Sequence, residues 1–161
     1  MDNTLYDCVI TSLPGMDKGK PAPGPSFLKG YLEPLGFKIK VIDGNQLDTL
    51  ENIHKEIAKY KFKWLGISVF SFMQKDDGLK LGEKYDNAFY GGSGVDLKWP
   101  SKNFIVGEGE YAIVEFLKGN FDYPGINGKP PKQIENIEDL PPPDYSDVIK
   151  EHKYGRFIIS G

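Results

Sequence analysis

The chain has 161 residues, of which 39% are hydrophobic and 27% charged, and its formal net charge is -3 at pH 7, which is typical of one globular domain with an appendage. Charges of both signs are interspersed, so we expect binding neither to nucleic acid nor to a membrane surface. No apolar run is long enough to cross a bilayer, and the N-terminus lacks a signal-peptide pattern, so we expect a cytoplasmic protein. Cys8 is the single cysteine, which excludes an internal disulfide and a cysteine-ligated metal or iron–sulfur cluster within this chain.

Short apolar runs alternate with helical patterns through residues 1–119. In chain order, the pattern predicts a strand at 6–12, a helix at 26–35, a strand at 37–43, a helix at 49–60, a strand at 64–69, a helix at 78–85, strands at 87–90 and 103–106, and a helix at 111–117. The loop at residues 13–25 is rich in proline and is predicted not to be helical. This alternation predicts an α/β domain built on a five-stranded parallel sheet.

Turns rich in glycine or serine follow four of the predicted strands, at residues 12–15, 70–71, 91–94 and 107–110. Parallel sheets bind their ligands over the carboxyl ends of the strands, and glycine lets a ligand approach the backbone closely. The sequence therefore predicts a ligand site at this edge of the sheet.

From residue 120 onward the sequence changes to turns and proline-rich stretches such as Leu140-Pro141-Pro142-Pro143-Asp144. We expect residues 120–161 to form an extended linker or strap, not a further layer of the domain. The apolar run at 157–159 is typical of a strand that has just begun. We therefore expect this chain to be one domain of something longer.

Several of these phrases, in this order, resemble the N-terminal cobalamin-binding-type domain of class B radical S-adenosylmethionine enzymes. The matching phrases are Gly24–Leu32, Gly36–Asp43, Gly66–Val69, Gly91–Gly94, Val106–Glu110, Ile126–Gly128 and Leu140–Tyr145. The resemblance implies a doubly wound, flavodoxin-like fold that positions a corrinoid against a catalytic barrel. S-adenosylmethionine and a [4Fe-4S] cluster would belong to that barrel, which is absent from this sequence and would act in cis or in trans.

The resemblance also implies which residues contact the cofactor. The loop after the first strand would lie beside the corrin ring, Ser68 and Ser71 would reach the nucleotide tail, and glycines after the fourth and fifth strands would bound the cleft. The predicted cofactor-binding residues are Leu13, Pro14, Gly15, Met16, Gly24, Ser68, Phe70, Ser71, Gly91, Gly92, Ser93, Gly94, Gly107, Glu108 and Gly109. No catalytic residue and no protein ligand to a metal is predicted.

The sequence departs from the wider cobalamin-binding pattern in the loop after the first strand. Many such domains place a cobalt-ligating histidine there, whereas residues 14–20 contain no imidazole, and Met16 is at best a weak ligand. We therefore expect cobalamin to be bound without a histidine ligand from the protein. His54 and His152 are expected to be solvent-facing or capping residues.

Other interpretations of the same residues remain open. Gly91–Gly94 also fits a tight turn with no ligand, and Glu110 also fits an acid that stabilises the start of a helix. Glu108 and Glu110 have no neighbouring histidine or further acid in sequence, so we do not predict a metal site there. The rival function is a docking domain of the same fold that has lost the corrinoid, and in either case the chain alone should have no turnover.

Overall fold

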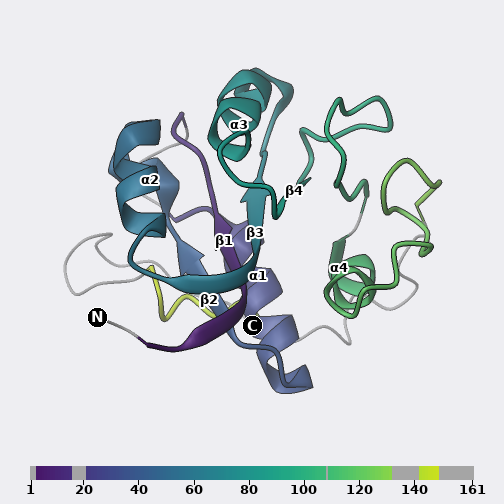
Figure 1. The fold of residues 1–161 in the computed structure, drawn as a ribbon, viewed down its shortest axis with the longest axis horizontal. Coiled ribbons are helices and arrows are strands. Elements are labelled where there is room, and N and C mark those ends of the chain that lie inside the picture. Colours follow the sequence, from purple (N-terminus) through teal and green to yellow (C-terminus); the bar gives the residue numbers. More distant parts are fainter. Residues whose placement is uncertain (1–2, 16–20, 108, 132–141, 149–161) are drawn as a thin grey trace.

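The computed structural model describes residues 3–15, 21–107, 109–131 and 142–148, and in this part of the chain four parallel strands form one sheet (Figure 1). The strand order is β2-β1-β3-β4, with parallel pairing at each step. The strands are β1 (Leu5–Thr11), β2 (Ile39–Ile42), β3 (Lys61–Ser68) and β4 (Ala88–Gly91), and the α-helices are α1 (Pro23–Leu32), α2 (Leu50–Ile57), α3 (Lys75–Gly82) and α4 (Gly109–Leu117). The predicted α/β class with a parallel sheet is confirmed.

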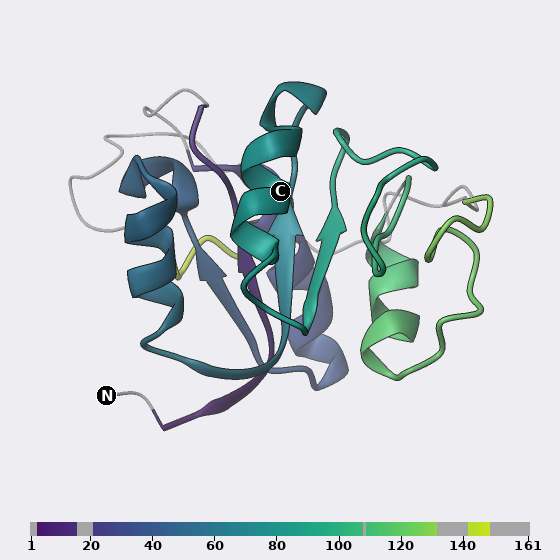
Figure 2. The same ribbon diagram turned by 45° about the horizontal axis from the view of Figure 1, so that its top comes forward.

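Helices cover both faces of the sheet, so the fold is doubly wound. Side chains of α2 and α3, including Ile53 and Leu81, pack with Leu65 on one face. Side chains of α1 and α4, including Leu32 and Phe116, pack on the other face. Figure 2 shows the blue α2 and teal α3 in front of the strands and the indigo α1 behind them. None of the helices within the described ranges is long and apolar enough to span a bilayer.

The predicted fifth strand is reduced to isolated bridges. Phe104 makes a parallel bridge to Tyr90, and Ile105 makes an antiparallel bridge to Ile126 in the following loop. The backbone N–H of Ile105 donates to the carbonyl of Tyr90 at 2.8 Å, so the segment lies beside β4 where a fifth strand would be. The prediction of five strands is therefore not confirmed, because the segment leaves β4 after one bridge and pairs with Gly125 and Ile126 of the following loop instead.

The first helix begins earlier than predicted. It starts at Pro23, inside the loop that was predicted to be non-helical, and Pro25 lies in its first turn. Proline is tolerated there because the first N–H groups of a helix have no partner within the helix. The helix ends through a short 3₁₀ turn at Glu33–Leu35, and Gly36 adopts a left-handed conformation with φ of 99°.

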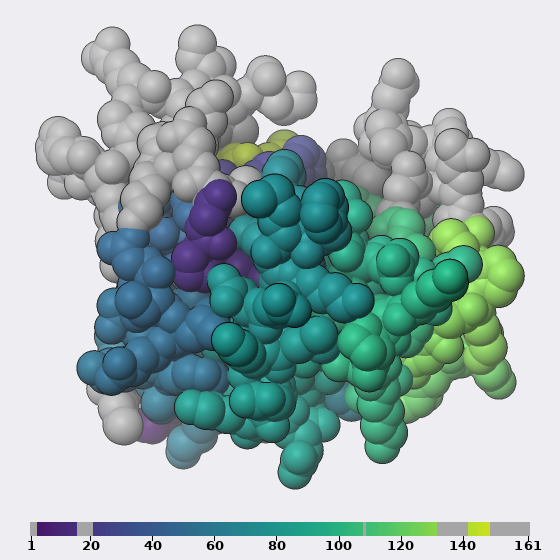
Figure 3. Space-filling view, turned by 90° about the horizontal axis from the view of Figure 1, so that it is seen from above, coloured from purple at the N-terminus to yellow at the C-terminus, as the bar shows by residue number. Residues whose placement is uncertain are grey.

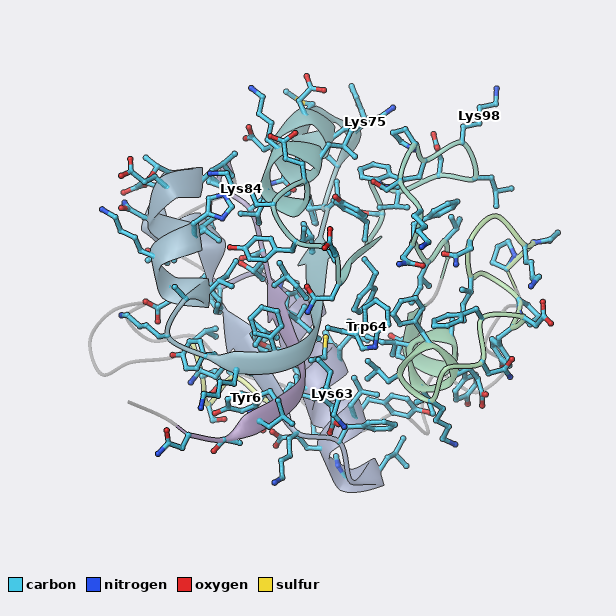
Figure 4. All side chains as sticks on the ribbon, viewed as in Figure 1. Tyr6, Lys63, Trp64, Lys75, Lys84 and Lys98 are labelled. Carbon is cyan, nitrogen blue, oxygen red and sulfur yellow. The ribbon has the colours of Figure 1, made fainter. Side chains whose placement is uncertain are left out.

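An aromatic cluster closes the face of the sheet beneath α4. Trp64 points from β3 toward α4 (Figure 4), where its ring lies 4.8 Å from that of Phe116 between centroids. The ring of Phe89 lies 4.5 Å from Phe116 in turn. This packing fixes α4 against the amino-terminal half of the strands.

The C-terminal segment, residues 142–148, packs against α1 and the free edge of β2. The carboxylate of Asp147 accepts a hydrogen bond from the backbone N–H of Val41 at 2.8 Å and pairs with Lys29 at 3.1 Å and Lys40 at 3.3 Å. Burial lowers the pKa of the Lys29 amine, but the neighbouring Glu33 and Asp147 carboxylates outweigh it and raise this pKa above its ordinary value. Lys29 is therefore charged at neutral pH. The rest of the predicted linker, residues 132–141 and 149–161, lies outside the described residues.

Cys8 lies at the centre of β1 and is fully buried. Burial raises the pKa of its thiol far above the ordinary value, so the reactive thiolate does not form at neutral pH. We expect Cys8 in the native protein to be inert toward a disulfide reagent such as dithionitrobenzoate and to react once the chain is unfolded in guanidinium. Rapid labelling of the native protein at neutral pH would contradict this placement.

Candidate functional site

A cavity of about 240 Å³ opens at the carboxyl ends of the strands, on the face that α1 and α4 cover. Ile10, Phe89 and Ile105 form its apolar floor. Phe27 and Leu28 of α1 form one wall, and the residues of the first turns of α4 form the other. The cavity is thus a slot between the sheet and the two helices α1 and α4.

Two glycines of the strands line this slot. A side chain at Gly66 of β3 would begin 3.0 Å from the ring of Phe89 and 3.5 Å from the sulfur of Cys8. Gly91 ends β4 and lies two residues after Phe89, so its missing side chain belongs to the same face of the sheet. Bare backbone therefore borders the slot at Gly91, whereas the space beside Gly66 is filled by the Phe89 ring and the Cys8 sulfur.

A second hollow, also of about 240 Å³, continues the slot toward the loops. It shares Gly24, Phe27, Ser68 and Gly92 with the first, and it extends to Phe70 and Ser93. A third hollow of about 530 Å³ lies between the loops after β1 and β3, where Pro14, Gly15 and Ser71 line it. Three adjoining hollows therefore follow the carboxyl edge of the sheet.

Hydrogen bonds from two side chains hold the loops of this edge together. The amide of Gln74 donates to the carbonyl of Pro14 at 2.9 Å and accepts from the backbone N–H of Phe70 at 2.9 Å. The hydroxyl of Ser93 donates to the carbonyl of Phe70. The loops after β1, β3 and β4 are thereby joined into one rim.

The rim presents large apolar side chains to solvent. Phe70 is 54% exposed, Phe72 is 80% exposed and Met73 is 81% exposed. All three follow β3, and Figure 3 shows the teal residues of this region at the middle of the upper face, between the purple end of β1 and the green segments after β4. Neighbouring exposed apolar side chains on one loop are a common mark of a binding surface.

The predicted glycines after β4 divide into two kinds. A side chain at Gly92 would overlap the carbonyl oxygen of Val69, and its φ of 108° is left-handed. A side chain at Gly94 would begin 2.6 Å from the carbonyl carbon of Ser71. The tight-turn interpretation therefore accounts for Gly92 and Gly94, whereas at Gly91 the nearest atom to an added side chain is 3.9 Å away.

The other predicted residues are placed as follows. Gly107 and Gly109 line the slot, but Gly107 also needs its φ of 87° and lies close to Pro131. Leu13 was predicted to bind the cofactor, and the structure buries its side chain fully in the core under α2 and α3, away from the slot. Met16 and Glu108 lie outside the described residues.

The sequence prediction missed most of the slot's walls. Phe27, Leu28 and Ile113 are helix residues whose spacing fits a core face, and Gly66 lies within an apolar strand. Their role depends on the gap between α1 and α4, which no local pattern reveals. For Gly66 a signal existed, because glycine inside a buried strand marks a close approach to the backbone.

No metal-binding cluster of three or more histidine, cysteine, aspartate or glutamate side chains occurs among the residues that the structure describes. His54 lies on α2, with its Nδ1 at 2.8 Å from the Tyr85 hydroxyl. Burial, and secondarily the charge of Lys84, lower the pKa of His54. His54 is thus part of the packing between α2 and the end of α3, while His152 lies outside the described ranges.

Two solved structures share this fold. No family model matches the chain, and no curated protein matches it either. One structure is the radical S-adenosylmethionine methyltransferase TsrM from Kitasatospora setae with cobalamin and a [4Fe-4S] cluster bound, with 18% identity and a TM-score of 0.58 over 86% of this chain and 31% of TsrM. The other is TsrM with tryptophan and aza-SAM, with 18% identity and a TM-score of 0.57 over 74% of this chain and 28% of TsrM. The chain thus spans less than a third of these neighbours, and it shares the fold of that part.

Proposed function

We propose that this chain is a cobalamin-binding domain whose slot between α1 and α4 takes the nucleotide tail of the cofactor. The observation that carries the proposal is the apolar, glycine-floored slot at the carboxyl edge of the parallel sheet. Its fold is that of a segment of a radical S-adenosylmethionine methyltransferase that has cobalamin bound. The fold likeness and the slot are independent observations, and both favour this function.

The size of the slot favours a ligand that enters only in part. Pockets that enclose a whole small molecule measure roughly 300 to 1,000 Å³, whereas the slot measures about 240 Å³ and opens into a second hollow of the same volume. A flat heteroaromatic base with its ribose suits such a slot, and the much wider corrin ring does not. We therefore propose that the tail is buried and that the ring lies outside, over the rim.

The rim carries residues suited to one face of a planar ring. Phe70, Phe72 and Met73 are exposed and apolar, and they lie on the loop that Gln74 and Ser93 hold in place. None of these three side chains is a strong cobalt ligand, which accords with cobalamin bound without a histidine from the protein. When bound, the cofactor would supply the organometallic chemistry of cobalt, and the residues of this chain would bind and orient it.

We propose that the catalytic step requires a second domain that holds S-adenosylmethionine and a [4Fe-4S] cluster, supplied in cis or in trans. The chain spans under a third of the methyltransferase whose fold it shares, and that enzyme has both cobalamin and the cluster bound. Within the described residues there is no metal-binding cluster that would let this chain hold iron itself. The chain alone is accordingly expected to have no turnover.

A docking domain without a corrinoid is the second candidate. The exposed side chains of Phe70, Phe72 and Met73 favour it, because such side chains also mark protein contacts. The slot argues against it, since an interaction domain has no need of a glycine-floored cavity between sheet and helices.

The two candidates are separated by cobalamin binding. The chain is mixed with hydroxocobalamin, free ligand is removed by gel filtration, and the visible spectrum of the protein peak is recorded. We expect about one corrinoid per chain. A colourless protein peak at ligand concentrations up to the millimolar range would contradict the proposed function and leave the docking domain.

A further inference from the structure

Among the described residues that line the slot, Glu110 is the one acidic residue. It lies in the first turn of α4, next to Gly109. One of its two carboxylate oxygens, Oε2, is sealed from solvent and has no hydrogen-bond partner. Among the described residues, no lysine, arginine or histidine forms an ion pair with it.

Among the described residues, the titratable group on which this carboxylate acts is a tyrosine hydroxyl and not a basic side chain. Its charge acts on Tyr31 of α1, where burial, the neighbouring Tyr111 and then Glu110 itself raise the pKa of the Tyr31 hydroxyl. Tyr31 and Tyr111 lie 6.1 Å apart between ring centroids, at the junction of the two helices. Glu110 therefore lies where α1 and α4 close one end of the slot.

The energetics argue against a purely structural role. An acid in the first turn of a helix gains about 0.3 to 1 kcal/mol from the helix dipole. A buried polar group without a partner costs about 1 to 3 kcal/mol, and more when it is charged. Only Oε2 is sealed and the side chain as a whole is half-buried, so this loss offsets the dipole gain unless something donates to that oxygen.

The terminal torsion of a glutamate side chain is broad, so rotation of the carboxylate brings either oxygen toward the slot. A carboxylate there accepts a hydrogen bond from a hydroxyl or an amide N–H. Acidic residues bind ribose hydroxyls in this way in other doubly wound folds. We propose that Glu110 accepts a hydrogen bond from a ribose hydroxyl of the nucleotide tail and so selects cobalamin over corrinoids without that tail.

This inference rests on the proposed function, and its test compares two corrinoids. Cobinamide has the corrin ring but not the nucleotide tail, so it cannot donate to Glu110. The dissociation constants of hydroxocobalamin and cobinamide are measured by spectroscopic titration for the wild-type chain, Glu110→Ala and Glu110→Gln. Glu115→Ala, five residues further along α4, is the matched control. The Glu115 carboxylate accepts a hydrogen bond from the Asn120 amide at 3.0 Å, and Glu115 is not among the residues that line the slot.

We expect Glu110→Ala to weaken cobalamin binding about 10- to 100-fold, the range for a hydrogen bond to a charged group, and to leave cobinamide binding unchanged. Glu110→Gln keeps an acceptor oxygen and should lose less. Both variants should melt at or above the wild-type temperature, whereas a structural helix acid would lower it. Equal loss for both corrinoids, or none for either, would overturn the role of Glu110. A wild-type chain that binds neither corrinoid would overturn the proposed function itself.

Discussion

Gly91→Val is expected to weaken cobalamin binding roughly 100-fold while leaving the fold intact. Gly91 ends β4 on the slot side of the sheet, and the nearest atom to an added side chain is the Ile105 carbonyl oxygen at 3.9 Å. Valine is favoured in strands, so we expect the free energy of unfolding to change little. Its methyl groups would occupy the floor of the slot, where the buried part of the ligand is proposed to lie.

The control for this variant is Gly92→Val, one residue further along. Gly92 has a left-handed φ of 108°, and its added side chain would overlap the carbonyl of Val69. We expect it to destabilise the protein by about 3 kcal/mol or more. Cobalamin titration together with guanidinium unfolding separates the two effects. If Gly91→Val binds cobalamin as the wild type does, the slot is not the site of the tail.

Much of the sheet could be predicted because each of its strands contains a short apolar run or an apolar alternation. β1 and β3 are the central strands, and their sequences are apolar enough to be recognised without knowledge of their partners. The edge is harder to predict, since a single bridge and a full strand have the same local sequence. Residues 104–106 form an apolar run that is typical of a strand, but only Phe104 bridges to β4.

The start of α1 shows a different limit. Prolines at residues 23 and 25 are evidence against a helix interior, yet they are compatible with a first turn. The resulting shift of three residues matters for the site, because it brings Gly24 into the helix and to the mouth of the slot. Helix ends depend on such positional chemistry, and composition alone does not reveal it.

The site could be predicted as an edge of the sheet, but not as a cavity. Glycine and serine turns correctly indicated the carboxyl ends of the strands, and Gly91, Gly107 and Ser68 do line the slot. The resemblance places Leu13 beside the corrin ring with the rest of the loop after β1, whereas in the structure its side chain lies in the core. Which side of the sheet opens is decided by the spacing of α1 and α4, a tertiary property.

The second prediction concerns residues 142–148, which pack against α1 and β2. Asp147 caps the backbone N–H of Val41 at the free edge of β2 and neutralises the buried Lys29. Asp147→Ala removes both interactions, although Lys29 keeps Glu33 at 2.8 Å. We expect a loss of about 2 to 3 kcal/mol in the free energy of unfolding, because a partner is taken from a buried charge and from an edge N–H.

That loss corresponds to a melting temperature lower by roughly 5 to 10 °C for a chain of this size. Asp122→Ala is the matched control, since Asp122 pairs with Lys129 on the surface, where its side chain is 93% exposed, and it should melt as the wild type does. Because the pKa of Lys29 is raised in the folded state, the contribution of its ion pairs is fully present below the ordinary lysine pKa and is lost as the pH rises beyond it. The difference between Asp147→Ala and the wild type should therefore be constant from pH 6 to 9. Equal melting temperatures for the two proteins in this range would mean that residues 142–148 do not hold this position in solution.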